Sequence, residues 1–167
     1  SGKSSKVKSI VTYDGNLEQA FAPMSVTLTL EDEIDVSRGD MIVHSSNVPE
    51  VISKFDANIV WMSETPMLPG KEYLIKVGTT TVSGHVATMR HKIDVNTMEQ
   101  HAGSDLELNE IALCELSLDR AIVADDYAEH QGTGSFIIVD RLSNLTVGAG
   151  MIRNNGVQQQ TEQPTDI

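Results

Sequence analysis

The feature that most constrains the fold is the segment of residues 134–152, GSFIIVDRLSNLTVGAGMI, in which a polar turn joins two apolar runs. Residues 135–139 are apolar at both odd and even positions, as in a strand covered on both sides, and residues 140–144 favour a turn. The returning run has one apolar face, formed by Leu145, Val147, Ala149 and Met151. Its other face is nearly bare of side chains and consists of Thr146, Gly148 and Gly150. Bare strand faces mark bends or close approach of another segment. The segment therefore predicts a β-hairpin that closes a small barrel.

Alternating apolar and polar residues, the period of a half-buried strand, recur along the rest of the chain. We expect strands at residues 6–12, 24–30, 41–43, 55–61, 73–77, 79–95 and 106–118. The alternation is clearest at residues 24–30, whereas residues 79–95 are too many for one small-barrel strand and predict a bend near Ser83 and Gly84, or a bulge. Residues 17–22 could form a single helical turn or a loop, and residues 124–130 a helix or a loop. Short strands separated by Gly and Pro turns predict an all-β sandwich or barrel.

Composition argues against some classes of function. The 167 residues carry a formal net charge of −12, which repels phosphate backbones and anionic membranes and so predicts neither nucleic acid nor a membrane as the main partner. Cys114 is the only cysteine, so no disulfide can form within the chain. The sequence also shows no leader and no apolar run of bilayer length, and we expect a cytoplasmic protein. Because the numbering begins at Ser1, we expect a processed or excised piece.

Candidate reactive residues are few. Gly2, Lys3 and Ser4 match the end of a phosphate-binding P-loop, but a β-prone run follows where a helix is needed, so we interpret them as a turn before a strand. Cys114 lies in an apolar run and is expected to be an inert core thiol. The histidines show no ligand spacing, since His85 and His91 on one unbroken strand would lie roughly 20 Å apart. We expect the histidines at the surface or barrel rim, namely His44, His85, His91, His101 and His130.

The acidic residues form two clusters, one of Glu31, Asp32, Glu33 and Asp35 and one of Asp125 and Asp126. Neither has the glycine and final glutamate of a calcium-binding EF-hand loop, so we expect solvated loops rather than metal or acid–base sites. Asp140 and Arg141 at the hairpin turn are expected to be a hydrated tip, with a partner contact as the alternative. The sequence therefore predicts no catalytic, cofactor-binding or metal-ligating residue in this chain.

A series of ordered motifs resembles one family. The motifs are residues 35–40 (DVSRGD), 60–62 (VWM), 66–70 (PMLPG), 94–97 (DVNT), 108–111 (LNEI), 140–144 (DRLSN) and 147–150 (VGAG). Together they resemble the C-terminal part of the large, GTP-hydrolysing subunit of bacterial sulfate adenylyltransferase, over about residues 1–152. The VGAG hairpin is also similar to the last barrel of translation elongation factors, whose architecture that subunit shares.

The resemblance implies translation-factor-like β-barrels. Residues 1–48 would be the later strands of a partial first barrel, and residues 51–153 a complete second barrel of the six-stranded type. The polar, glutamine-rich residues 154–167 are expected to be a disordered tail or linker. The GTPase domain of the family has no counterpart here, so GTP and magnesium are expected to bind the parent protein and no cofactor is expected in this chain.

In that family, GTP hydrolysis is coupled to the synthesis of adenosine 5′-phosphosulfate from ATP and sulfate by a small catalytic subunit. The resemblance implies that this chain is inactive alone, braces the GTPase domain and contacts the small subunit. Two alternatives stay open: a translation-factor module that binds aminoacyl-tRNA, and an independent small enzyme with an unrecognised site. If the first barrel lacks its opening strands, we also expect unpaired strand edges, or strands recruited from a second copy in an edge-paired or swapped homodimer.

Overall fold

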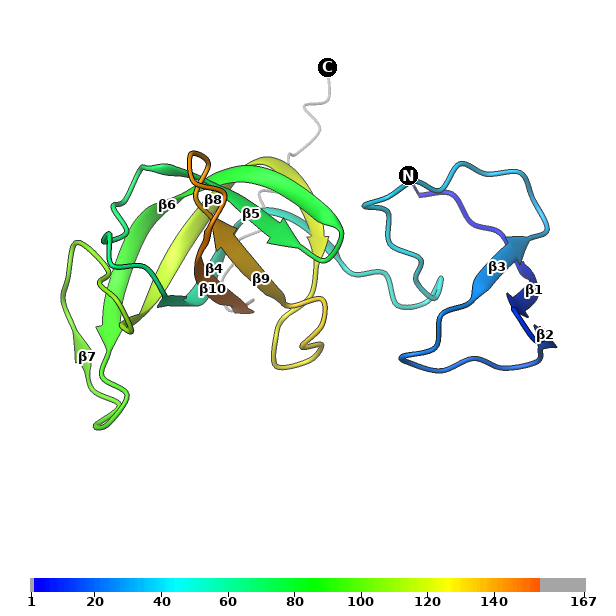
Figure 1. Cartoon of the computed structure of the whole chain (residues 1–167), viewed down its shortest axis with the longest axis horizontal. Coiled ribbons are helices and arrows are strands. Elements are labelled where there is room, and N and C mark those ends of the chain that lie inside the picture. The colour runs from blue at the N-terminus through cyan, green and yellow to red at the C-terminus, as the bar shows by residue number, and fades with distance from the viewer. Residues whose placement is uncertain (1, 154–167) are drawn as a thin grey trace, which may run out of the picture.

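The computed structural model describes residues 2–153, which form a small sheet and a separate barrel joined by residues 31–49 (Figure 1). The small sheet has the antiparallel order β2–β1–β3, with β1 Val7–Thr12, β2 Gly15–Leu17 and β3 Thr27–Leu30. The described residues contain no helix, and so none long and apolar enough to cross a membrane. The predicted all-β fold is confirmed.

The second part is a closed antiparallel barrel. Its strands are β4 Glu50–Trp61, β5 Glu72–Val77, β6 Thr80–Ile93, β7 Gln100–His101, β8 Ile111–Ala124, β9 Ser135–Val139 and β10 Thr146–Arg153. They follow the order β5–β9–β10–β4–β8–β6–β7, and an additional β5–β6 pairing closes the first six into a ring. The short β7 pairs only with the end of β6. The expected six-stranded barrel is therefore present.

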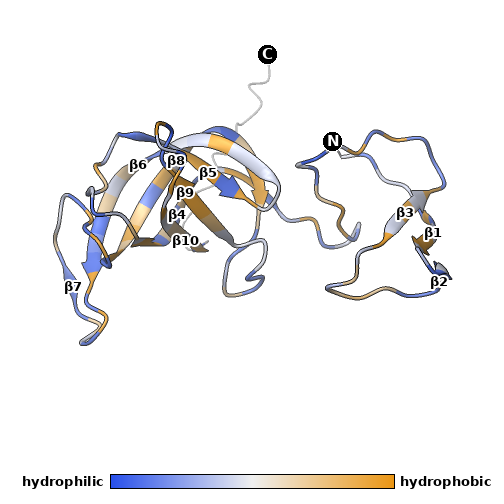
Figure 2. Cartoon of the chain, viewed as in Figure 1, coloured by the Kyte–Doolittle hydropathy of each residue, from blue (hydrophilic) through white to orange (hydrophobic). Residues whose placement is uncertain are grey.

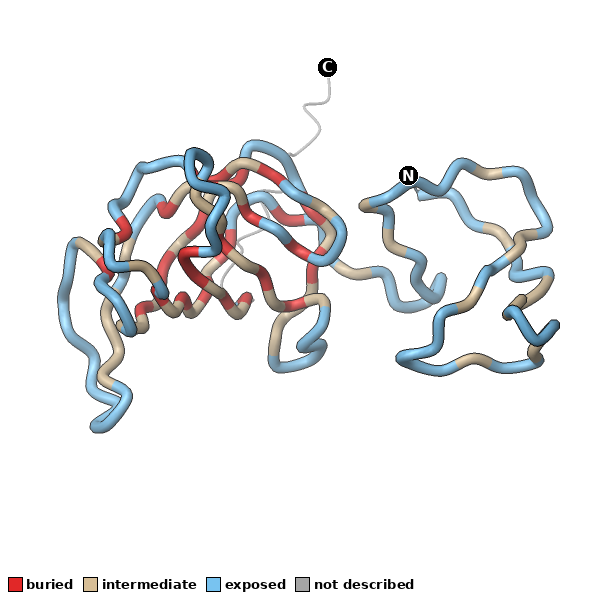
Figure 3. Tube along the Cα trace, viewed as in Figure 1, coloured by how far each residue is buried: buried red, intermediate tan, exposed pale blue. Residues whose placement is uncertain are grey.

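The core lies entirely inside the barrel. Figure 3 shows buried segments only there, and residues 2–49 contain no buried residue. The predicted alternation holds in β4, where Phe55, Ala57, Ile59 and Trp61 are at most 3% exposed. Aromatic rings fill the interior in edge-to-face pairs, with centroids 5.8 Å apart for Phe55 and Phe136 and 5.6 Å apart for Trp61 and Tyr73.

The predicted hairpin is confirmed as β9 and β10, and its bare face points inward. Gly148 and Gly150 are buried, whereas Ala149 and Met151 on the other face are only half-buried. A Cβ atom at Gly150 would lie 2.5 Å from Cε1 and Cε2 of Phe136, and one at Gly148 would lie 3.1 Å from Cε3 of Trp61. The glycines therefore make room for aromatic rings in a barrel whose wall bends tightly around them.

The long strands of the barrel bend at bulges. The pairing of β6 with β8 shifts between Val86 and Thr88 and again between Met89 and His91. The predicted bulge is thus present, but beyond Ser83 and Gly84, which both pair regularly with β5. β8 begins at Ile111 rather than near residue 106 and continues to Ala124, and residues 125–130 form a loop with a hydrogen-bonded turn at 126–130 rather than a helix.

The small sheet corrects several predictions. β3 begins only at Thr27, because its partner β1 pairs with it from Thr27 to Leu30, so residues 24–26 lie outside the strand. Residues 41–43 have no pairing partner and form no strand, and Leu17 belongs to β2 rather than to a helical turn. Both β2 and β3 are sheet edges, as expected for an incomplete barrel. The predicted tail at residues 154–167 lies outside the described residues.

Candidate functional site

The histidines do not converge. His85 and His91 are half-buried on β6, and His44, His101 and His130 are exposed, which agrees with positions at the surface and rim. Within residues 2–153, no group of three or more His, Cys, Asp or Glu side chains could hold a metal ion. The structure therefore assembles no metal site from the described histidines and acids.

The other sequence candidates occupy structural positions. Cys114 is fully buried in β8, and burial, with a smaller effect of the Asp56 carboxylate, raises the pKa of its thiol to about 12. The thiol is therefore protonated at neutral pH and is a poor nucleophile. Gly2, Lys3 and Ser4 are exposed and irregular, and β1 follows them, so they lack the helix of a phosphate-binding loop.

The acidic clusters fix their own loops. Ser5 Oγ donates to Asp32 Oδ2 at 2.7 Å, which ties the loop after β3 to the segment before β1. Thr133 Oγ1 donates to Asp125 Oδ2 at 2.6 Å, and the Ala128 amide donates to Asp126 Oδ1 at 2.8 Å. These bonds favour a structural role in the loops over an acid–base site, whereas the sequence predicted solvated loops.

The hairpin turn is held against the barrel rather than free in solvent. The Asp140 carboxylate accepts hydrogen bonds from the amide of Ser143 at 2.9 Å and from that of Leu142 at 3.2 Å, and the Ser143 amide in particular lowers the pKa of Asp140. Asp140 also pairs with Lys71 at 3.4 Å, and Arg141 pairs with Glu72 at 2.6 Å. The turn is therefore fastened to the start of β5, which the expectation of a hydrated tip did not include.

A network of ion pairs crosses the outer face of β4, β8 and β6. Arg90 bonds Asp56 at 3.0 Å and Glu115 at 3.1 Å, and Lys92 lies 2.6 Å from Glu110. The hydrogen bond to Glu110 raises the pKa of Lys92, so this lysine stays protonated and cannot act as a base at neutral pH. No sequence pattern signals these pairs, because Arg90 lies 34 and 25 residues from its partners.

The strongest candidate for a contact surface is an apolar hollow on the outside of β9, β10 and β4. It has a volume of about 540 Å³ and is lined by outward-facing side chains that include Val60, Ile137, Ala149 and Met151. These four are half-buried although they point away from the core. Figure 2 shows the hydrophobic colour of these strands. Exposed apolar surface of this kind suits contact with a protein.

Comparison with known proteins gives a consistent result. Residues 54–153 match the family described as GTP-eEF1A C-terminal domain-like. Sulfate adenylyltransferase subunit 1 of Saccharophagus degradans is 55% identical over 152 residues, which cover 91% of this chain and 32% of that protein. The same subunit of Aliarcobacter butzleri is 53% identical, covering 95% of this chain and 34% of that protein. The bifunctional enzyme CysN/CysC of Rhodopirellula baltica is 54% identical, covering 93% of this chain and 24% of that protein.

The chain thus spans about a third or less of the length of these relatives. Among solved structures, sup35 complexed with GDP is similar with a TM-score of 0.76 at 18% identity, covering 88% of this chain and 36% of that one. At this identity the likeness concerns the fold alone, and it confirms the expected translation-factor-like architecture.

Proposed function

The chain belongs to the GTP-eEF1A C-terminal domain-like family, and we propose that it is the tandem-barrel portion of a sulfate adenylyltransferase subunit 1. In this proposal the parent protein works in the cytoplasm, binds GTP and magnesium in a separate domain, and serves sulfate assimilation. The barrels brace the GTPase domain and contact the small catalytic subunit, which forms adenosine 5′-phosphosulfate from ATP and sulfate. The chain alone is inactive.

One observation carries the proposal: identity of 55% over 91% of the chain to a protein of that name. The geometry supports an accessory role. The only thiol is buried, and the acidic residues Asp32, Asp125 and Asp140 hold loops and turns in place. The hollow around Met151 offers apolar surface of the kind that protein contacts use.

Calorimetry of this chain with the purified small subunit tests the contact. We expect saturable binding, and no sulfate-dependent release of pyrophosphate from ATP by the chain alone. Met151→Asp puts a charge into the hollow, and Leu142→Asp is the matched control, because Leu142 is 92% exposed at the hairpin turn. Weaker binding of the first variant alone would locate the contact at the hollow. Absence of binding by the unmodified chain would contradict the docking role, and turnover by the chain alone would contradict its inactivity.

A further inference from the structure

A second hollow lies where the small sheet's connection meets the barrel. It has a volume of about 730 Å³, and its walls come from three places in the chain: the turn at residues 38–40, the β5–β6 hairpin with Lys76, and the stretch of β8 from Arg120 to Val123. Three cations therefore line one cleft, Arg38, Lys76 and Arg120, each supplied by a different element.

A large bulge in β8 presents Arg120. Against β4, Ile122 pairs with Ile52 and Ser117 with Lys54, so four residues of β8 oppose Ser53 alone. The surplus pushes residues 119–121 out of the wall, where all three are exposed. Bulges of this kind re-aim side chains. The Arg120 guanidinium is then fixed, because its Nη2 donates to the Thr81 carbonyl at 3.0 Å.

The β5–β6 hairpin brings Lys76 to the same place. Lys76 is the direct cross-strand partner of Thr81, the residue that anchors Arg120. Directly paired residues point to the same side of a sheet, and here both are exposed on the outside of the barrel. Lys76 and Arg120 are therefore held on either side of one backbone position.

The connection from the small sheet closes the third side. Thr80 Oγ1 donates to the Gly39 carbonyl at 3.2 Å, which ties the turn carrying Arg38 to the hairpin tip. Gly39 has φ +101°, and a Cβ atom there would lie 3.0 Å from Thr80 Oγ1. Both the backbone conformation and this close approach therefore favour glycine beside Arg38.

The charge of this cleft is opposite to that of the protein. The ion pairs within residues 2–153 are made by Lys71, Arg90, Lys92 and Arg141, so the three cations of the cleft, like Lys8 and Lys54 elsewhere, have no carboxylate partner among these residues. Asp40 is the only carboxylate among the lining residues, and it already accepts the Ser37 amide at 2.8 Å. Like charges that lie close together without counterions destabilise the fold, and uncharged side chains at these positions would avoid this cost. Cations focused in a cleft attract anions even when the net charge is −12.

We propose that this cationic cleft binds a small molecule that carries two or more phosphate groups. The guanidinium of Arg120 offers the planar pair of donors that suits a phosphate, and Lys76 adds a point charge. The volume lies within the range of small-molecule sites, and the cations that line this one cleft come from three separate segments of the chain. A compact polyanion therefore fits better than an extended acidic chain. The inference does not rest on the proposed function.

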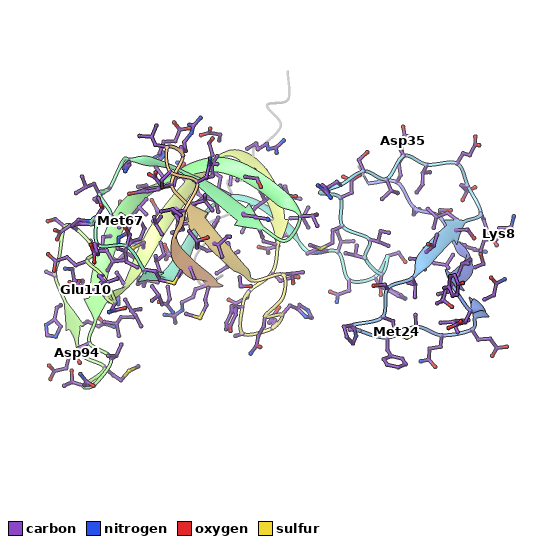
Figure 4. All side chains as sticks on the ribbon, in the orientation of Figure 1. Lys8, Met24, Asp35, Met67, Asp94 and Glu110 are labelled. Carbon is purple, nitrogen blue, oxygen red and sulfur yellow. The ribbon has the colours of Figure 1, made fainter. Side chains whose placement is uncertain are left out.

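The test is titration of the whole chain with inorganic diphosphate at low ionic strength, followed by calorimetry and by amide NMR shifts. We expect saturable binding, with shifts concentrated at residues 78–81 and 120–123, and weaker binding of inorganic monophosphate. Lys76→Gln and Arg120→Gln should each weaken binding about tenfold. Lys76→Gln is informative even if Arg120→Gln disturbs the fold, because the Arg120 side chain bonds the backbone. Lys8→Gln removes the same charge from β1, on the small sheet and away from the cleft (Figure 4), and should leave binding unchanged.

Three results would overturn the proposal. One is the absence of saturable diphosphate binding. Another is an equal loss of affinity in the Lys8 and Lys76 variants, which would show attraction by net charge only. The third is salt-sensitive binding of an RNA oligonucleotide that needs Lys76 and Arg120 while diphosphate does not bind, because the ligand would then be nucleic acid.

Discussion

Substitution of Gly150 by alanine is the sharpest test of how the barrel packs. Gly150 is paired directly with Phe136 across β9 and β10, and an added methyl group would lie 2.5 Å from two atoms of the ring. The ring cannot swing outward, because Phe136 is 3% exposed and packs edge-to-face on Phe55. The closed wall of the barrel must therefore absorb the overlap.

The expected cost follows from two opposing effects. Overpacking a closed core costs about 1–3 kcal/mol. Replacing glycine by alanine also restricts the unfolded chain, which returns roughly 0.4–1 kcal/mol. We therefore expect Gly150→Ala to lower the free energy of unfolding by about 1–2 kcal/mol. Gly132→Ala is the matched control, since nothing lies within 4 Å of its added Cβ, and its effect should stay within about 0.5 kcal/mol.

Urea denaturation followed by Trp61 fluorescence measures this change in the barrel specifically. Trp61 is the only tryptophan and is 1% exposed inside the barrel. With a slope of about 2 kcal/mol per M, the midpoint should fall by roughly 0.5–1 M. In a Phe136→Leu background the alanine should cost about 1 kcal/mol less, because the ring is gone. A Gly150→Ala protein as stable as the unmodified one, or a cost independent of residue 136, would refute this account of the packing.

Three further predictions concern side chains and edges outside that contact. Because Glu110 raises the pKa of Lys92 above its ordinary value of 10.5, the ion pair stabilises the fold below pH 10.5, and this contribution is lost as the pH rises through the raised pKa. Lys92→Gln should therefore lower the free energy of unfolding by under about 1 kcal/mol at neutral pH and leave it unchanged in strong alkali. Urea denaturation at the two pH values measures both effects. Cys114 should react with a thiol reagent only after unfolding, and rapid labelling of the native protein would contradict its burial. The open edges of β2 and β3 should allow self-association, so light scattering should show a mass that rises with concentration, whereas a monomer throughout would count against edge pairing.

The sequence predicted the barrel strands well where apolar and polar residues alternate along a strand that faces the closed interior. In β4, β5 and β8 the inward positions could be read directly, since a ring of strands has one inside and each second residue must face it. β10 was harder, because two of its inward positions are Gly148 and Gly150, and hydrophobicity alone does not mark a glycine as core. Only the opposing rings of Trp61 and Phe136 explain why the bare face turns inward.

The surface features escaped prediction for a different reason. The ion pairs of Arg90 and the cluster of Arg38, Lys76 and Arg120 join residues that are far apart in the chain. No periodicity encodes such neighbours, and the bulge that presents Arg120 depends on how many residues β8 inserts against β4. Strand pairing therefore has to be known before these charges can be placed together.

The small sheet shows that alternation of apolar and polar residues does not bury a strand face where the fold has no closed interior. Residues 24–30 have the clearest strand pattern of the chain, yet Met24 and Leu28 are 38% and 36% exposed, and β3 spans only the part that β1 pairs. A strand face becomes buried only when a second layer or a closed ring covers it, and the described residues supply neither to this sheet. The apolar positions are nevertheless those of a half-buried strand. We therefore expect further strands to cover the apolar face of β3. This follows from the pattern and the open edges together, and it agrees with the exposure of apolar residues such as Val7 and Phe21 in a part of the chain where residues 2–49 contain no buried residue.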